Sequence, residues 1–124
     1  MNMNEIIKNQ RKLQTHVDEH GHRFRDLSDM TDKYCSAISG EVEEVRDEVN
    51  WKWWKNPKEV VIEKLKEEVA DIFIFWLDYV LRAGFDDIWD IVMKKQEINI
   101  KRQQGLIEGR EDYKVGDQNE NLPV

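Results

Sequence analysis

The sequence predicts an all-α protein, with four helices arranged as a bundle-like domain. Three observations carry this prediction. Apolar residues recur at spacings of three and four over much of the chain, which is the period of one helix face. No stretch of useful length alternates apolar and polar residues as a half-exposed strand does. The two prolines, Pro57 and Pro123, both lie outside the periodic stretches.

The first two helices are separated by a polar connector. The first helix is expected over residues 4–19, where apolar residues gather on one face, and Gly21 ends it. The second helix is expected to begin near Ser28 or Thr31, because hydroxyl side chains suit a helix start. Its periodic pattern predicts that it runs to about residue 55.

A tight turn at Asn56 and Pro57 is expected to join the second helix to the third. Proline is well tolerated in the first turn of a helix, so Pro57 suits the start of the third helix. This helix is expected to reach about Arg82, and Gly84 follows as its C-terminal break. The pattern then predicts a fourth helix over residues 86–104.

The composition is that of one soluble, acidic domain. A chain of 124 residues has room for one core, and we expect the domain to cover residues 1–112, followed by a polar, mobile tail over residues 113–124. The net charge of −7 argues against broad attraction to nucleic acid or to an anionic membrane. The single cysteine, Cys35, can form no disulfide within the chain.

No targeting or membrane segment is visible in this sequence. The first residues lack the apolar stretch of a signal peptide. The longest apolar run, at 69–81, is too short to cross a bilayer and contains Asp71 and Asp78. We therefore expect a cytoplasmic protein.

Two pairs of carboxylates are the main candidates for chemistry. Glu41 and Glu44 lie three residues apart, as do Glu68 and Asp71, so each pair projects from one face of a helix. An isolated pair such as the first is usually just a solvated face. Asp71 is harder to explain in this way, because it interrupts a strongly apolar run, although a lysine or arginine of another helix would also satisfy it.

The spacing of these pairs predicts that they meet. Glu44 lies 12 residues before Asn56 and Glu68 lies 12 residues after it. In an antiparallel hairpin of two helices both would lie about 18 Å from the turn, and hence side by side. Four clustered carboxylates suit a hard divalent cation such as Mg²⁺.

The segment WKWWKN, at residues 51–56, places three tryptophans and two lysines together. Tryptophan stacks well on a nucleobase and lysine neutralises phosphate. The alternative is an amphipathic helix end, with the tryptophans in the core and the lysines near the helix C-terminus. The segment alone leaves both interpretations open.

Lys95, Asn99 and Arg102 form a polar stripe on the fourth helix. Their spacings of four and three place them on one face. Such a stripe suits a chain of phosphates, but taken alone it is more often a solvated face.

Together these motifs resemble the all-α nucleoside triphosphate pyrophosphatase superfamily, which is MazG-like, and within it the dimeric, Mg²⁺-dependent dUTPases. The superfamily pattern of ExxE on one helix and ExxD on the next is matched by the four carboxylates. WKWWKN and the series Lys95, Asn99, Arg102 and Gln103 match further dUTPase-like motifs. The resemblance spans roughly residues 9–114.

The resemblance implies Mg²⁺-dependent hydrolysis of a deoxynucleoside triphosphate, dUTP first of all, to the monophosphate and pyrophosphate. Two or three Mg²⁺ ions would be held by Glu41, Glu44, Glu68 and Asp71, with Glu44 as the catalytic base. The implied substrate-binding residues are Gln10, Gln14, Lys52, Trp53, Trp54, Lys55, Lys95, Asn99, Arg102, Tyr113 and Lys114. Of these, the glutamines would read the base, a tryptophan would stack on it, and the basic residues would bind phosphates.

Other functions compete with this one. The short gap between the ExxD motif and Lys95 is more like that of MazG-type or dCTP-cleaving relatives, so dCTP or a non-canonical nucleotide is the alternative substrate. A non-enzymatic helical interaction module is the alternative outside enzymes. We also expect a homodimer or homotetramer, because the third helix is apolar nearly all round and needs burial on more than one side.

Overall fold

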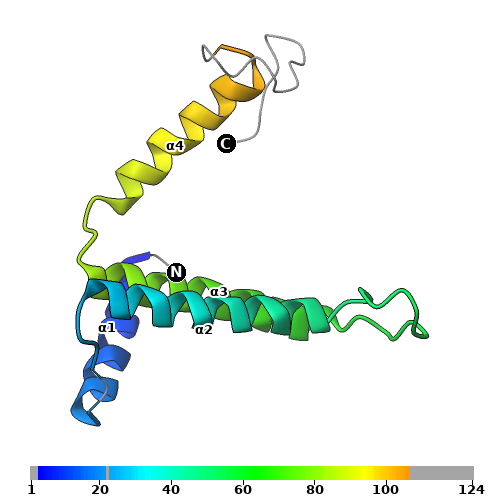
Figure 1. The fold of residues 1–124 in the computed structure, drawn as a ribbon, viewed down its shortest axis with the longest axis horizontal. Helices are drawn as coiled ribbons and strands as arrows, with labels where there is room; N and C mark the ends of the chain where they lie inside the picture. The colour runs from blue at the N-terminus through cyan, green and yellow to red at the C-terminus, as the bar shows by residue number, and fades with distance from the viewer. Residues whose placement is uncertain (1–2, 22, 107–124) are drawn as a thin grey trace. The chain divides into compact units, whose positions relative to one another are not determined.

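The computed structural model describes residues 3–21 and 23–106, and every regular element among them is a helix (Figure 1). The prediction of an all-α fold is thereby confirmed. The helices are α1 (Met3–Glu19), α2 (Leu27–Asp47), α3 (Ile62–Ala83) and α4 (Ile88–Gln103). None of the described helices combines the length and the apolar character that crossing a membrane requires.

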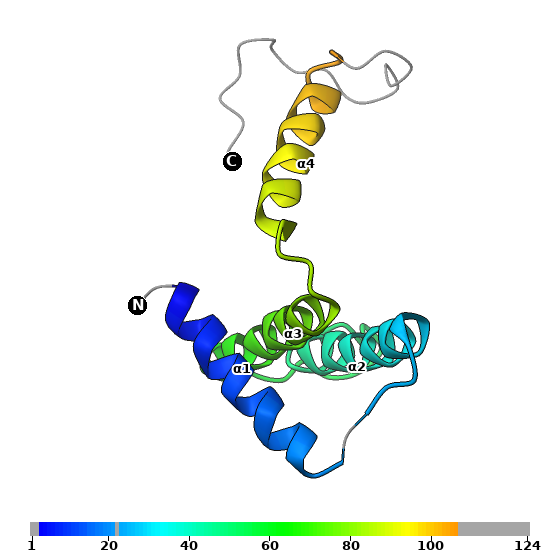
Figure 2. The ribbon, with the colours of Figure 1, turned by 90° about the vertical axis from the view of Figure 1, so that its left-hand side faces the viewer.

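The helices fall into two compact units. α1, α2 and α3 belong to the unit that ends at Phe85, and α4 belongs to the unit that starts at Asp86. In the first unit α2 and α3 lie side by side as an antiparallel hairpin, and α1 packs against α3 (Figure 2). The expectation of one domain over residues 1–112 stays a prediction.

The core of the first unit is small and lies mainly between α2 and α3. Its buried apolar residues are Met30, Tyr34, Leu77 and Val80, and Leu77 is fully enclosed. α1 joins this core through polar contacts as well. The side chain of Arg82 on α3 pairs with Asp18 on α1, with 3.0 Å between the nitrogen and the oxygen.

The predicted C-terminus of the second helix is wrong, because α2 ends at Asp47 and not near residue 55. The reason is a set of contacts between residues distant in sequence. The side chain of Asn50 accepts a hydrogen bond from the backbone N–H of Lys58 and donates one to its carbonyl. The ammonium of Lys58 also donates to the carbonyl of Asp47, which is one of the last free carbonyls of α2. These bonds favour a loop over residues 48–61.

The start of α3 moves for the same reason. Residues up to Val61 are not helical, so α3 begins at Ile62 and Pro57 lies in the loop rather than in a first helical turn. The other end agrees with the sequence. Gly84 caps α3 with φ of 71°, a left-handed conformation that glycine adopts without strain. α2 begins at Leu27, where Asp26 caps it by accepting from the N–H of Asp29 at 2.8 Å.

Candidate active site

The structure brings the four predicted carboxylates together. Glu41 and Glu44 project from α2, Glu68 and Asp71 project from α3, and one oxygen of each lies within 4.8 Å of the others. The two helices run past each other in the register that the sequence spacing requires. They do so although the helices end before the turn, at Asp47 and Ile62.

The cluster is electrostatically strained. Burial raises the pKa of Glu41, and a hydrogen bond to Glu44 and the charges of Glu44 and Asp71 add to the effect. The pKa of Glu68 is also raised, first by its hydrogen bond to Glu44, then by burial and by the neighbouring charges. The charge of Glu44 thus raises the pKa of one neighbour on each helix.

The donor set fits a hard cation. Oxygen Oε2 of Glu41 and Oε2 of Glu68 are buried and have no hydrogen-bond partner. Among the ion pairs found in residues 3–21 and 23–106, none neutralises any of the four carboxylates. Buried carboxylate oxygens without a partner are costly, and Mg²⁺ binds such all-oxygen sets. The residues present therefore suit a divalent metal.

A cavity of about 530 Å³ lies beside the carboxylates. Gln10 and Gln14 line it from α1, Ala37 from α2, and Ile74 and Asp78 from α3, together with seven other residues: Leu13, Val17, Phe24, Lys33, Tyr34, Phe75 and Arg82. Ala37 is four residues before Glu41 and Ile74 is three after Asp71, so the cavity begins about 5 Å along the helices from the cluster.

Asp78 organises the polar part of this cavity. Its Oδ1 accepts from Nε2 of Gln10 at 2.9 Å and from Nε2 of Gln14 at 2.7 Å. Its Oδ2 accepts from the hydroxyl of Tyr34 and lies 3.6 Å from Nε of Arg82. Burial and the bond to Asp78 raise the pKa of Tyr34. Our sequence prediction did not assign Asp78 to the site, although an aspartate inside an apolar run, seven residues after Asp71, was a usable signal.

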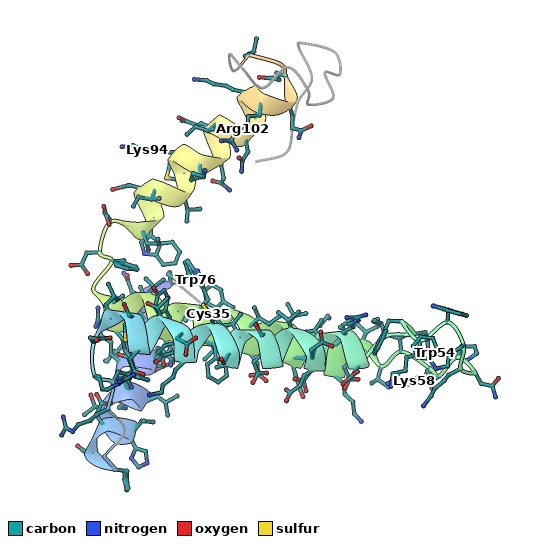
Figure 3. The ribbon with its side chains drawn as sticks, in the orientation of Figure 1. Cys35, Trp54, Lys58, Trp76, Lys94 and Arg102 are labelled. Atoms are coloured by element: carbon teal, nitrogen blue, oxygen red, sulfur yellow. The ribbon has the colours of Figure 1, made fainter. Side chains whose placement is uncertain are left out.

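The tryptophan loop lies on the other side of the carboxylates. Along α2 the order is Ala37, the carboxylates, and then the loop over residues 48–61. Figure 3 shows Trp54 at the loop end of the α2–α3 hairpin and Cys35 toward its other end. The structure therefore does not bring the predicted stacking residues to the cavity lined by the glutamines within one chain.

The loop residues themselves are well placed for contact with another molecule. The side chains of Trp53 and Trp54 are 87% and 56% exposed, and their rings meet edge to face at 5.4 Å. Lys52 and Lys55 line a second, smaller cavity of about 340 Å³ next to them. Trp51 does not share this exposure, because the guanidinium of Arg46 lies 3.9 Å from the centre of its ring.

The predicted phosphate-binding stripe lies in the second unit. Lys95, Asn99 and Arg102 share one face of α4, and Nη1 of Arg102 lies 3.5 Å from Oδ1 of Asn99. Tyr113 and Lys114 lie outside the described residues. The structure thus describes the stripe only within the second unit.

A comparison with known families decides the identity. The family model described as dUTPase matches residues 2–86. The chain belongs to the all-α, MazG-like dUTPase family. The match contains the four carboxylates, both glutamines and the tryptophan segment, and it ends before Lys95. No curated protein and no solved structure gives a significant match to the chain.

Family membership confirms the resemblance seen in the sequence. As a member of the dUTPase family the chain is a nucleoside triphosphate diphosphatase, and its substrate is a nucleotide. The family is typically metal-dependent, in agreement with the acidic cluster. The non-enzymatic alternative is therefore set aside, and the open questions concern the substrate, the metal and the assembly.

Proposed function

We propose that this protein hydrolyses dUTP to dUMP and pyrophosphate, with two or three Mg²⁺ ions held by Glu41, Glu44, Glu68 and Asp71. The observation that carries the proposal is the convergence of these carboxylates, within 4.8 Å of one another, about one helical turn from a cavity of about 530 Å³. A volume of this size is typical of small-molecule sites, which measure about 300–1,000 Å³.

The carboxylates have distinct tasks in this mechanism. Bound Mg²⁺ would neutralise charge on the triphosphate and make the attacking water more acidic. Glu44 would accept the proton of that water, because it is the one exposed carboxylate of the four and is therefore open to solvent. Glu41, Glu68 and Asp71 would hold the ions.

The nucleoside is assigned to the cavity beside the cluster. Its apolar walls exclude water, and its amide groups offer hydrogen bonds to a base edge from Gln10 and Gln14. Because the cavity begins about one helical turn from the carboxylates, a base bound there leaves the phosphates at the metal site. Lys95, Asn99 and Arg102 are proposed to bind phosphates from α4.

A second copy of the chain is proposed to complete this site, in a homodimer or homotetramer. The tryptophan loop lies on the far side of the carboxylates from the cavity, so Trp53 and Trp54 would contact the base only from a partner subunit. Lys52 and Lys55 would assist on the same loop. α3 also leaves large apolar side chains exposed, including Ile62, Val69 and Phe73 at 54%, 50% and 37%, as expected for a helix buried in an interface. Light scattering that gives only the monomer mass of 14.9 kDa would refute the assembly.

The test is pyrophosphate release from dUTP, dCTP, dTTP and non-canonical nucleotides, with Mg²⁺ and with a chelator. We expect the highest kcat/KM for dUTP and no turnover with the chelator. Glu68→Gln should abolish turnover, whereas Glu67→Gln, an exposed neighbour on α3, should retain it. A clear preference for dCTP would transfer the function to the alternative substrate, and metal-independent turnover would refute the assigned role of the carboxylates.

A further inference from the structure

Asp78 is held between two sets of partners on its two oxygens. Oδ1 faces the glutamines of α1, and Oδ2 faces the hydroxyl of Tyr34 and the guanidinium of Arg82. Its side chain is only 16% exposed. A carboxylate with partners on both oxygens cannot rotate without breaking contacts on both sides, so its direction is fixed.

The chemistry of Asp78 in turn fixes the orientation of both glutamine amides. An ionised carboxylate only accepts hydrogen bonds, so each glutamine must present its NH₂ group to Asp78. The amide oxygens of Gln10 and Gln14 are then directed elsewhere, and within the described part of the chain no donor binds them. Both glutamines line the cavity, which therefore offers two hydrogen-bond acceptors to a ligand.

We propose that Asp78 is a positioning residue that determines base preference, because it makes Gln10 and Gln14 act as acceptors for the N3–H group of uracil. This inference rests on the proposed function. Uracil carries a hydrogen at N3 and cytosine carries a lone pair there, so an acceptor at this point attracts one base and repels the other. Sites built to bind a polar hydrogen of the substrate reject analogues that lack it strongly.

The structure predicts how Asp78→Asn weakens the preference for uracil over cytosine. In Asp78→Asn the new amide keeps its oxygen toward Tyr34 and Arg82, because the positive guanidinium of Arg82, 3.6 Å from this oxygen, attracts an amide oxygen and repels an NH₂ group. Its NH₂ group then faces Gln10, which must turn its own oxygen inward and present a donor to the cavity. Gln14 differs, because its Nε2 also donates to the backbone carbonyl of Asp78 at 3.0 Å, and that bond survives the substitution.

The first experiment compares kcat/KM for dUTP and dCTP in Asp78→Asn and in Asp18→Asn. Asp18 pairs with the same Arg82 but does not line this cavity, so it controls for charge and for the ion pair. We expect the ratio for dUTP over dCTP to fall at least about tenfold in Asp78→Asn, as the loss of about one hydrogen bond implies. The ratio should be unchanged in Asp18→Asn. Equal ratios in all three proteins would overturn the inference.

The second experiment does not depend on turnover, so its outcome separates this inference from the proposed function. The side-chain amide protons of Gln10 and Gln14 should be protected from solvent exchange in the wild type by NMR. In Asp78→Asn the signals of Gln10 should shift and lose protection more than those of Gln14. Unprotected amides in the wild type would refute the inference even if dUTP is hydrolysed, and this wild-type measurement decides the matter even if the variant does not fold.

Discussion

Binding of Mg²⁺ should stabilise the wild-type protein far more than Asp71→Asn. The four carboxylates each place one oxygen within 4.8 Å of the others, and two buried oxygens lack a hydrogen-bond partner. A cation that binds the folded state alone stabilises it by RT ln(1 + [L]/Kd). Asp71→Asn removes one of the four ligands and part of the repulsion, so this variant should gain less from the metal.

The size of the effect follows from the size of the folding unit. At Mg²⁺ concentrations 10 to 100 times Kd the stabilisation is about 1.4 to 2.7 kcal/mol. The unit that contains the cluster ends at Phe85, and for a unit of that length the unfolding entropy is about 0.18 kcal/mol per kelvin. We therefore expect the Tm of the wild type to rise by roughly 8 to 15 °C. Asp71→Asn should show less than half of this rise.

The assay is thermal unfolding by circular dichroism at constant ionic strength, with Mg²⁺ replaced by Na⁺ in the reference. Glu67→Gln is the matched control, because it removes one charge of α3 from an exposed residue outside the cluster. Its Tm should rise as much as that of the wild type. Equal rises in the wild type and in Asp71→Asn would refute the assignment of Asp71 as a ligand.

Three further predictions concern catalysis, packing and pH. Glu44→Gln should lower kcat by at least about 100-fold in the pyrophosphate assay. The control is Glu43→Gln, which should retain activity, because the side chain of Glu43 pairs with Arg46 and lies outside the cluster. Similar rates in both variants would remove Glu44 from the mechanism. Leu77→Ala, at a fully enclosed site, should lower the free energy of unfolding by about 2–5 kcal/mol in urea titrations, and a loss below about 1 kcal/mol would contradict the assigned core. The backbone N–H of Arg25 and the ammonium of Lys33 hold the pKa of Asp29 well below its usual range. The bonds of Asp29 therefore stabilise the fold at pH values above about 4 and are lost as the pH falls further. The Tm difference between the wild type and Asp29→Asn should accordingly shrink on acidification. A Tm difference that grows at low pH would contradict the lowered pKa of Asp29.

The sequence alone predicted the elements whose signals are local. Helical periodicity gave the bounds of α1 and α4 within about two residues, and Gly84 marked the end of α3. The carboxylate site was predictable for a similar reason. A charged residue such as Asp71 inside an apolar run has few inexpensive explanations, and the spacing to Glu44 in a hairpin leaves little freedom of register.

The parts that were missed depend on contacts between distant residues. α2 ends early because Asn50 and Lys58 bind across the loop, and no helical pattern contains that information. The role of Asp78 was likewise missed. Its partner Gln10 is 68 residues away, and the contact exists only because α1 packs on α3. The contact between Gln10 and Asp78 can be identified only once the packing of α1 on α3 is known.

Two of the carboxylates, Glu41 and Glu68, occupy helix positions at which an apolar residue would stabilise the fold more. Glu41 continues a stripe of shielded residues on α2 that includes Tyr34 and Val45, and Glu68 continues the facing stripe on α3 between Leu65 and Ile72. At both places an apolar side chain would pack the two helices together. The protein instead places carboxylates there, with raised pKa values and unpartnered oxygens. Departures from local packing rules of this kind concentrate at functional sites, and here the departure lies in the helix interface, where it holds four ligands in one fixed arrangement.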